Sequence, residues 1–280
     1  MGMRIAVIVV FAGKEGDPGF KLVASAYQRN FALVKNPDTE VDVFFLRNGL
    51  TTFEEFGYRH QMFLNDREMY HAILEAEKSG YDAVVPMCFF DPVLEEARKA
   101  VEIPVVAQGE TELFYASMMG GRFGVITINE EAVSLTDDLI EKYGYRHRAV
   151  RTRSIGIPGA AQLIAAVDAS HDIEAFTQVA RESIKDGAQV LVPGCSGISM
   201  ALRLAAGCED KYPDGVTEID GVAILDGMSV VVKTAEALVA LKRGGSSFIS
   251  RVGRYSRPPR EVDEMTLAKF PYRGSGVWKA

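Results

Sequence analysis

The sequence contains few cysteines and few histidines for its length. Three cysteines and four histidines occur in 280 residues. So few cysteines, and an odd number of them, do not build the disulfide framework of a small secreted domain. No histidine stands at metal-ligand spacing from another histidine or from a cysteine, so we expect no zinc or other metal site. The thiols are therefore free to be core residues or catalytic groups.

Long apolar runs and an excess of basic charge are also missing. No segment reaches the roughly 20 apolar residues of a membrane-spanning helix, and the run at 5–12 has the length of a strand. The net charge is −7, which argues against nucleic acid as a partner because phosphate binding needs a basic surface. We expect a cytoplasmic protein that binds a small molecule, with neither a membrane nor a nucleic-acid partner.

Short runs rich in Val and Ile alternate with amphipathic stretches along most of the chain. The predicted strands are 4–11, 41–46, 81–87, 103–107, 122–128, 189–193 and 222–225. The predicted helices are 24–33, 66–78, 92–100, 111–119, 173–185, 199–206 and 229–242. This alternation is typical of parallel βαβ units and predicts an α/β fold. Asp91 is expected to cap the helix at 92–100.

An internal repeat is the most informative feature of the sequence. Residues 79–88 read SGYDAVVPMC and residues 186–195 read DGAQVLVPGC, with the same distance from Gly to Cys. The strand predicted at 122–128 also resembles the one at 4–10. The repeat predicts two related half-domains about a pseudo-two-fold axis. We place the first half at 1–117, to which the chain could return after 225, the second at 118–228, and a final helix and tail at 229–280.

Two segments are less regular and carry many aromatic residues. Residues 48–65 could form a lid or an interface segment. The tail at 244–280 contains five aromatic residues, and we expect it to pack either on this domain or on a neighbouring subunit. A homo-oligomer is the assembly that we expect.

Cys88 and Cys195 end the two repeated strands. Ligands bind at the carboxyl ends of strands in open α/β sheets, and a following helix start would lower a thiol pKa. If the halves face each other, the two sulfurs approach one substrate carbon from opposite sides, so that one removes a proton and the other delivers one. A lone cysteine is usually a small core residue. The matched pair favours catalysis, whereas Cys208, outside the repeat, is expected to be structural.

The same residues resemble the aspartate/glutamate/hydantoin racemase superfamily, closest to its hydantoin and allantoin racemases. The resemblance covers about residues 4–243. It rests on the motifs Cys88-Phe89-Phe90-Asp91-Pro92, 103–106 leading to Gly109-Glu110, 122–127, Gly194-Cys195-Ser196-Gly197 and Leu225-Asp226-Gly227. It implies two flavodoxin-like parallel-sheet halves with the active site in the cleft between them. It also implies that Cys88 and Cys195 are the acid/base pair, with no cofactor.

Further site residues follow from these motifs. The resemblance implies that backbone groups of Phe89, Phe90, Ser196 and Gly197 hold substrate oxygens. Phe11, Phe89 and Phe90 could form an aromatic wall for an apolar substituent or could be plain core.

Two polar residues near the expected cleft have alternative roles. Glu110 could bind a substrate N–H, although capping the helix at 111–119 is the commoner role. Thr127 could supply a pocket hydroxyl or be an ordinary strand residue.

The sequence leaves several functions open. The first is a racemase or epimerase that acts on an acidic carbon next to a carbonyl, such as that of a 5-substituted hydantoin. A maleate-type cis-trans isomerase is an alternative, although those enzymes typically follow each cysteine with Thr or Ser. An arylmalonate-type decarboxylase keeps only one of the two cysteines, so the pair counts against it. A non-catalytic small-molecule binding protein is the alternative from another class.

Overall fold

The computed structural model describes residues 2–52, 55, 58–156, 164–270 and 276–280 of the chain. The aromatic residues Phe53, Phe56 and Tyr272 of the two irregular segments lie outside this part. The strands are β1 (Met3–Ala12), β2 (Thr39–Leu46), β3 (Ala83–Met87), β4 (Phe123–Thr127), β5 (Arg153–Ser154), β6 (Val190–Pro193), β7 (Glu218–Ile219), β8 (Val222–Ile224) and β9 (Val277–Lys279). The helices are α1 (Pro18–Ala32), α2 (Arg59–Lys78), α3 (Leu94–Ala100), α4 (Gln108–Met119), α5 (Glu130–Lys142), α7 (Ser170–Lys185), α8 (Ser196–Leu204), α9 (Gly227–Arg243) and α10 (Arg260–Lys269), with a 3₁₀ turn η2 (Gly253–Tyr255).

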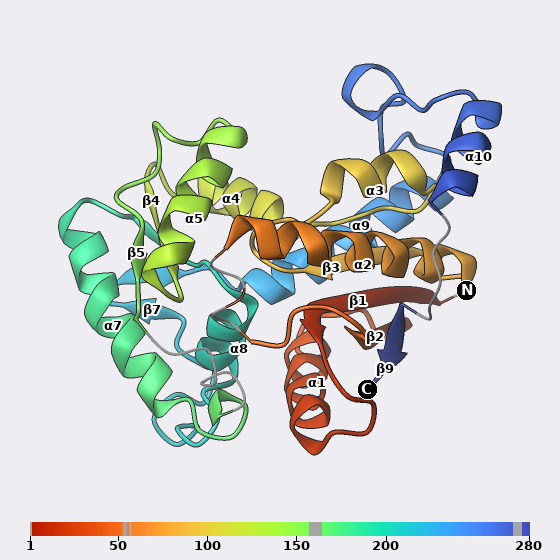
Figure 1. Ribbon diagram of the computed structural model, residues 1–280. Helices are drawn as coiled ribbons and strands as arrows, with labels where there is room; N and C mark the ends of the chain where they lie inside the picture. Colours follow the sequence, from red (N-terminus) through yellow and green to blue (C-terminus); the bar gives the residue numbers. More distant parts are fainter. Residues whose placement is uncertain (1, 53–54, 56–57, 157–163, 271–275) are drawn as a thin grey trace.

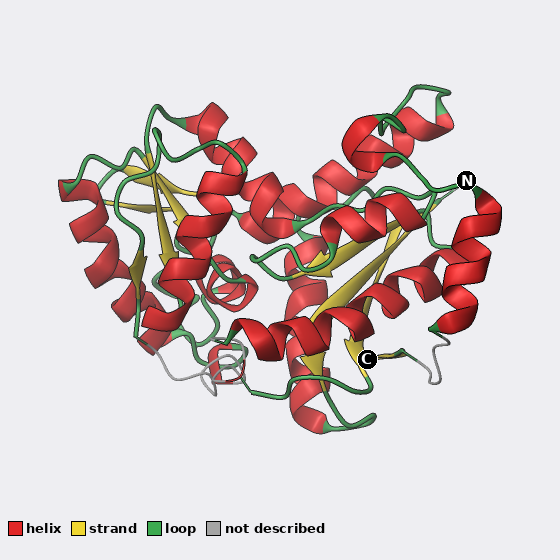
Figure 2. Cartoon of the chain, turned by 45° about the horizontal axis from the view of Figure 1, so that its top comes forward, coloured by secondary structure: helices red, strands yellow, loops and turns green. Residues whose placement is uncertain are grey.

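The strands form two separate sheets. Their orders are β3-β1-β2-β9 and β5-β4-β6-β8-β7. All neighbours are parallel except β2 with β9 and β7 with β8. Figures 1 and 2 show the two groups of strands side by side, each with helices packed around it. The prediction of an α/β fold built from two mostly parallel half-domains is confirmed.

The two halves share one strand register. Ile8 of β1 lies opposite Pro86 of β3, and Ile126 of β4 lies opposite Pro193 of β6. These isoleucines and prolines occupy equivalent positions in the sequence repeat. The repeat therefore describes a structural unit, a pair of parallel strands with fixed alignment, in which the proline stands two residues before a cysteine.

The glycine in each copy of the repeat ends a helix. Gly80 follows α2 with φ 77° and Gly187 follows α7 with φ 92°, a left-handed backbone that favours glycine. The N–H after each glycine bonds a carbonyl five residues earlier (Tyr81 to Ala76 and Ala188 to Ser183). This is the Schellman motif, and it turns the chain from each helix into the strand that carries the cysteine.

Some element boundaries differ from the prediction. Residues 103–107 do not form a strand, because Val105 makes only an isolated bridge to Val84. Pro104 has no N–H to donate, and α4 begins at Gln108, so the chain leaves the sheet at once. Helix α2 begins at Arg59, earlier than predicted. Among the described residues, no helix combines the length and the apolar character needed to cross a bilayer.

The last residues of the tail join the first sheet of their own chain. Strand β9 pairs with β2, and the termini lie in the same half (Figure 1). Trp278 is 3% exposed, and its ring centroid lies 5.3 Å from that of Phe45. Its indole N–H donates to the carbonyl of Gly13 at 2.8 Å. The end of the chain is therefore part of the core of the first half.

Replacing Trp278 by Ala should lower the free energy of unfolding by about 3–5 kcal/mol, since a buried aromatic ring leaves a cavity. Circular dichroism during urea unfolding measures it. Phe270→Ala is the matched control, because that ring is 69% exposed and its loss should change stability by no more than about 0.5 kcal/mol. Equal effects of the two substitutions would contradict a structural role for β9.

Candidate functional site

Cys88 and Cys195 lie at the carboxyl ends of equivalent strands. Cys88 directly follows β3, and Cys195 follows β6 after Gly194. The backbone N–H of each bonds the proline carbonyl two residues earlier (Cys88 to Pro86 at 2.9 Å, Cys195 to Pro193 at 2.7 Å). Neither forms a disulfide, and both are buried. The chain thus makes the same tight turn at each cysteine.

Both cysteines line one small cavity between the halves. Its lining comes from the ends of β1, β3, β4 and β6 and the loops after them: Val10, Phe11, Met87, Cys88, Phe89, Phe90, Ile128, Gly194, Cys195 and Ser196. The cavity volume is about 30 Å³, enough for about one or two water molecules. The space beside the two cysteines is therefore much smaller than a five-membered ring with a substituent.

The surroundings of Cys88 favour the neutral thiol. Burial raises the pKa of Cys88, and the nearby Cys195, Asp91 and Asp66 raise it further. The backbone N–H of Phe90 donates to the Cys88 sulfur and opposes this shift. The expectation that a helix start lowers the Cys88 pKa is wrong, because α3 begins only at Leu94 and burial dominates.

Cys195 lies directly at a helix start. It is the N-cap residue of α8, with extended backbone angles of φ −163° and ψ 137°. The first N–H groups of a helix lack intrahelical acceptors and favour negative charge. Ser196, the next residue, accepts a hydrogen bond on its hydroxyl oxygen from the Tyr27 hydroxyl at 2.9 Å. This end of the cavity thus provides N–H donors that can face an anionic oxygen.

Asp91 does not cap its own helix, contrary to expectation. Its carboxylate accepts from the backbone N–H of Gly109 at 2.6 Å and of Glu110 at 2.7 Å, so it caps α4 instead. The Tyr143 hydroxyl also donates to it at 2.7 Å. Burial raises the pKa of Asp91 to about 7, although these three hydrogen bonds lower it. Asp91 therefore anchors the loop that follows Cys88.

Three of the predicted site residues do not line the cavity. Glu110 lies within α4 and forms a two-point ion pair with Arg98 at 2.9 and 2.5 Å. Thr127 is fully buried, and its hydroxyl donates to the carbonyl of Gly194 at 3.4 Å. Gly197 is the second residue of α8. The other six predicted residues line the cavity: Phe11, Cys88, Phe89, Phe90, Cys195 and Ser196.

Residue-by-residue reasoning missed several side chains at the site. Val10 and Ile128 line the cavity from opposite halves. They occupy equivalent positions at the ends of the runs 4–10 and 122–128, so comparing these two runs residue by residue would have found them. Tyr27 is 1% exposed and reaches the site from the middle of α1, where no sequence signal distinguishes it from a core residue.

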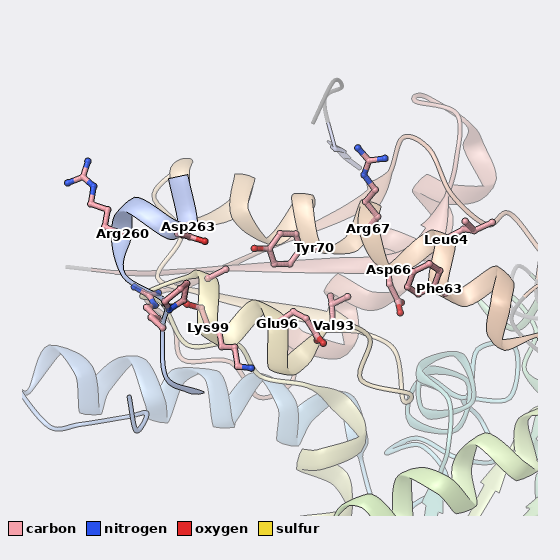
Figure 3. Close-up of a pocket in the computed structure, with 13 residues that line it drawn as sticks. Phe63, Leu64, Asp66, Arg67, Tyr70, Val93, Glu96, Lys99, Arg260 and Asp263 are labelled. Atoms are coloured by element: carbon pink, nitrogen blue, oxygen red, sulfur yellow. Dashed lines mark hydrogen bonds between the residues drawn. The ribbon is translucent and has the colours of Figure 1, made fainter. Parts of the chain in front are cut away.

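A larger pocket lies between α2, α3 and the tail (Figure 3). Its volume is about 1010 Å³, and its described lining includes Phe63, Asp66 and Tyr70 of α2 and Glu96 of α3, with neither cysteine. Burial, reinforced by Glu96, raises the pKa of Asp66 to about 6. Within the described part of the chain, no group of three or more His, Cys, Asp or Glu is placed to hold a metal ion.

Comparison with known proteins agrees with this geometry. The family model described as Asp/Glu/Hydantoin racemase matches residues 37–235. The chain belongs to this family, which makes it an isomerase of the racemase class.

Individual relatives cover most of the chain. A hydantoin racemase of Pseudomonas sp. (strain NS671) is 28% identical over 240 residues, 83% of this chain and 86% of that protein. A hydantoin racemase of Rhizobium meliloti is 30% identical over 66% of this chain and 70% of that protein. The allantoin racemase of Klebsiella pneumoniae has the same fold, with a TM-score of 0.73, 23% identity, and coverage of 92% and 95% of the two chains.

The raised pKa of Asp66 predicts a pH dependence of stability. A carboxyl that binds its proton more tightly when folded makes the free energy of unfolding fall as pH rises from about 4 to about 6. Asp66→Asn should make the free energy of unfolding depend less on pH. The difference in free energy of unfolding between the variant and the wild type should rise in favour of the variant by about 1 kcal/mol from about pH 4 to about pH 6, after allowance for partial exposure. Urea unfolding at several pH values measures it, with the exposed Asp210→Asn as control. Parallel pH curves for wild type and Asp66→Asn would contradict the shift.

Proposed function

We propose that this protein is a cofactor-independent racemase or epimerase that acts on an acidic carbon next to a carbonyl. One observation carries the proposal: two buried thiols, one from the same strand end in each half, line a single cavity. The substrate class that we propose is a 5-substituted hydantoin or a related ureide. The hydantoin racemases among its sequence relatives support this choice.

The proposed reaction exchanges one proton for another. One cysteine thiolate removes the proton from the acidic carbon, and the C–H electron pair passes to the adjacent carbonyl as an enolate. The other cysteine, a thiol, then delivers its proton to the opposite face, and the electron pair returns to form the new C–H bond. Product of opposite configuration leaves, with the two sulfurs having exchanged protonation states. Because its surroundings favour the neutral thiol, Cys88 starts as the acid.

The start of α8 is suited to stabilise the enolate oxygen. Ser196 and Gly197 open this helix immediately after Cys195, and its first N–H groups have no intrahelical acceptor. Donors that are already oriented toward a developing negative charge lower the barrier more than water does. In contrast, the N–H of Phe90 donates to the Cys88 sulfur. We therefore assign the substrate oxygen to the side of Cys195.

The cavity wall favours an apolar substituent on the substrate. Val10, Phe11, Phe90 and Ile128 line it beside the two sulfurs. An apolar group that leaves water for such a wall gains about 25 cal/mol per Å² of buried surface. We propose that this wall receives the side chain at the reacting carbon.

Replacing either catalytic thiol should abolish turnover. Cys88→Ser and Cys195→Ser should each lower the racemisation rate by about 10³-fold or more, because a hydroxyl is a much weaker acid and base at neutral pH. The measurement follows circular dichroism and deuterium uptake for single enantiomers of methyl-, isobutyl- and benzyl-substituted hydantoins and allantoin in D₂O, with spontaneous exchange subtracted.

Cys208→Ser is the matched control, since this thiol lies outside the cavity lining, and it should keep wild-type activity. Racemisation at the wild-type rate in Cys88→Ser or Cys195→Ser would contradict the two-cysteine mechanism. If the wild type racemised none of these substrates, unsaturated diacids and malonates would test the isomerase and decarboxylase alternatives. Ligand-induced stabilisation without carbon–deuterium exchange would instead favour a binding protein.

Shortening Phe11 should change substrate preference more than catalysis. Phe11→Ala should lower kcat/KM for benzylhydantoin about tenfold more than for methylhydantoin, because only the larger substituent uses the wall. Phe114→Ala, on a ring that is 51% exposed and outside the cavity, should leave the ratio unchanged. An equal loss on both substrates would show that Phe11 supports the fold and does not select the substituent.

A further inference from the structure

The segment after each cysteine, which is a loop after Cys88 and the start of α8 after Cys195, accepts a hydrogen bond from a tyrosine of the opposite half. Tyr27 of α1, in the first half, donates its hydroxyl proton to the Ser196 hydroxyl oxygen beside Cys195. Tyr143, which follows α5 in the second half, donates its hydroxyl proton to Asp91, three residues after Cys88. The two contacts join residues 169 and 52 positions apart in the chain. Each half thus donates one tyrosine hydrogen bond to the segment that follows the cysteine of the other half.

The loop after Cys88 needs such an anchor because its backbone is strained. Asp91 and Val93 have φ angles of 51° and 50°, a left-handed conformation that is costly for a β-branched residue such as Val. Strain of this kind persists only where surrounding contacts hold it. The Asp91 carboxylate supplies them by accepting from Tyr143 and from two N–H groups of α4.

The Tyr27 hydroxyl lies among the groups that form the site. Tyr27 is 1% exposed and Ser196 is 8% exposed, so their hydrogen bond is shielded from water. Burial raises the pKa of the Tyr27 phenol, and the proximity of Cys195 and Cys88 adds to the shift. The phenol is therefore neutral and is a donor at physiological pH, and it sits near both sulfurs.

We propose that Tyr27 and Tyr143 are reciprocal positioning residues, Tyr27 for Cys195 and Tyr143 for Cys88. Any separation of the halves breaks both hydrogen bonds, so both thiols are held in place only when the halves are closed around the reacting carbon. The role in turnover rests on the proposed racemase function, whereas the effect on the two loops does not.

Alkylation of the thiols tests the positioning without any substrate. Wild type, Tyr27→Phe and Tyr143→Phe are treated with iodoacetamide, and mass spectrometry gives the rate at each cysteine relative to Cys208. Tyr143→Phe should raise the relative rate at Cys88, and Tyr27→Phe that at Cys195, each by about fivefold, as expected when one buried hydrogen bond no longer closes a loop.

Tyr81→Phe is the matched control. The Tyr81 hydroxyl donates to the Asp42 carboxylate at 2.6 Å, and both residues are buried within the first half. This substitution also removes one buried tyrosine–acceptor bond, so it reproduces a general loss of stability. It should change neither Cys88 nor Cys195 selectively. The proposal would be overturned if Tyr27→Phe and Tyr143→Phe gave the same relative alkylation rates at Cys88 and Cys195 as Tyr81→Phe.

Kinetics supply a second readout that a general loss of stability would not move. Each positioning variant should lower kcat about tenfold with little change in KM, because the thiol is misaligned with a substrate that still binds. In each variant, the primary deuterium isotope effect should grow for the enantiomer whose proton is removed by the affected cysteine. The larger isotope effect should therefore appear with one enantiomer in Tyr27→Phe and with the other enantiomer in Tyr143→Phe. Equal isotope effects in both directions would overturn the role in turnover. If the wild type racemised no substrate, the proposed function would fail while the alkylation result still decided the positioning.

Discussion

Parallel strand pairing places the two thiols, and the rest of the site depends on it. Strand β3 pairs with β1 in the same register in which β6 pairs with β4. Because the carboxyl ends of parallel strands share one edge of a sheet, each cysteine emerges where its sheet borders the other half. The chain makes the same turn after each proline, and both cysteines line one cavity.

Burial has two consequences for this site. It removes Cys88 from water and so raises the pKa of this thiol, which favours its neutral form. It also leaves a cavity of only about 30 Å³ beside the two thiols. A site of low dielectric constant strengthens hydrogen bonds to any group that carries negative charge.

Apolar packing joins the two halves over a larger region than the cavity. The largest apolar cluster contains residues of both sheets, including Val7 of β1 and Leu191 of β6. Helix α9 packs against α1, α4 and β3, so the chain returns from the second sheet to the first. Strand β9 then completes the first sheet with Trp278 in its core. This shared packing brings one tyrosine of each half within hydrogen-bonding distance of the segment that follows the cysteine of the other half.

The sequence by itself determined the α/β class, the duplicated strand units and the two cysteines at their ends. These features depend on short-range patterns, namely apolar runs and a fixed Gly-to-Cys spacing that encodes a helix end, a strand and a turn. Only the tertiary structure decided that Asp91 caps α4, that Glu110 pairs with Arg98 away from the cavity, and that Tyr27 and Tyr143 reach the opposite loops. It also decided the direction of the Cys88 pKa, where burial outweighs the single N–H donor. The physical reason is that hydrogen-bond partners and burial depend on how separate helices, loops and strands pack against one another, which the local pattern of the sequence does not specify.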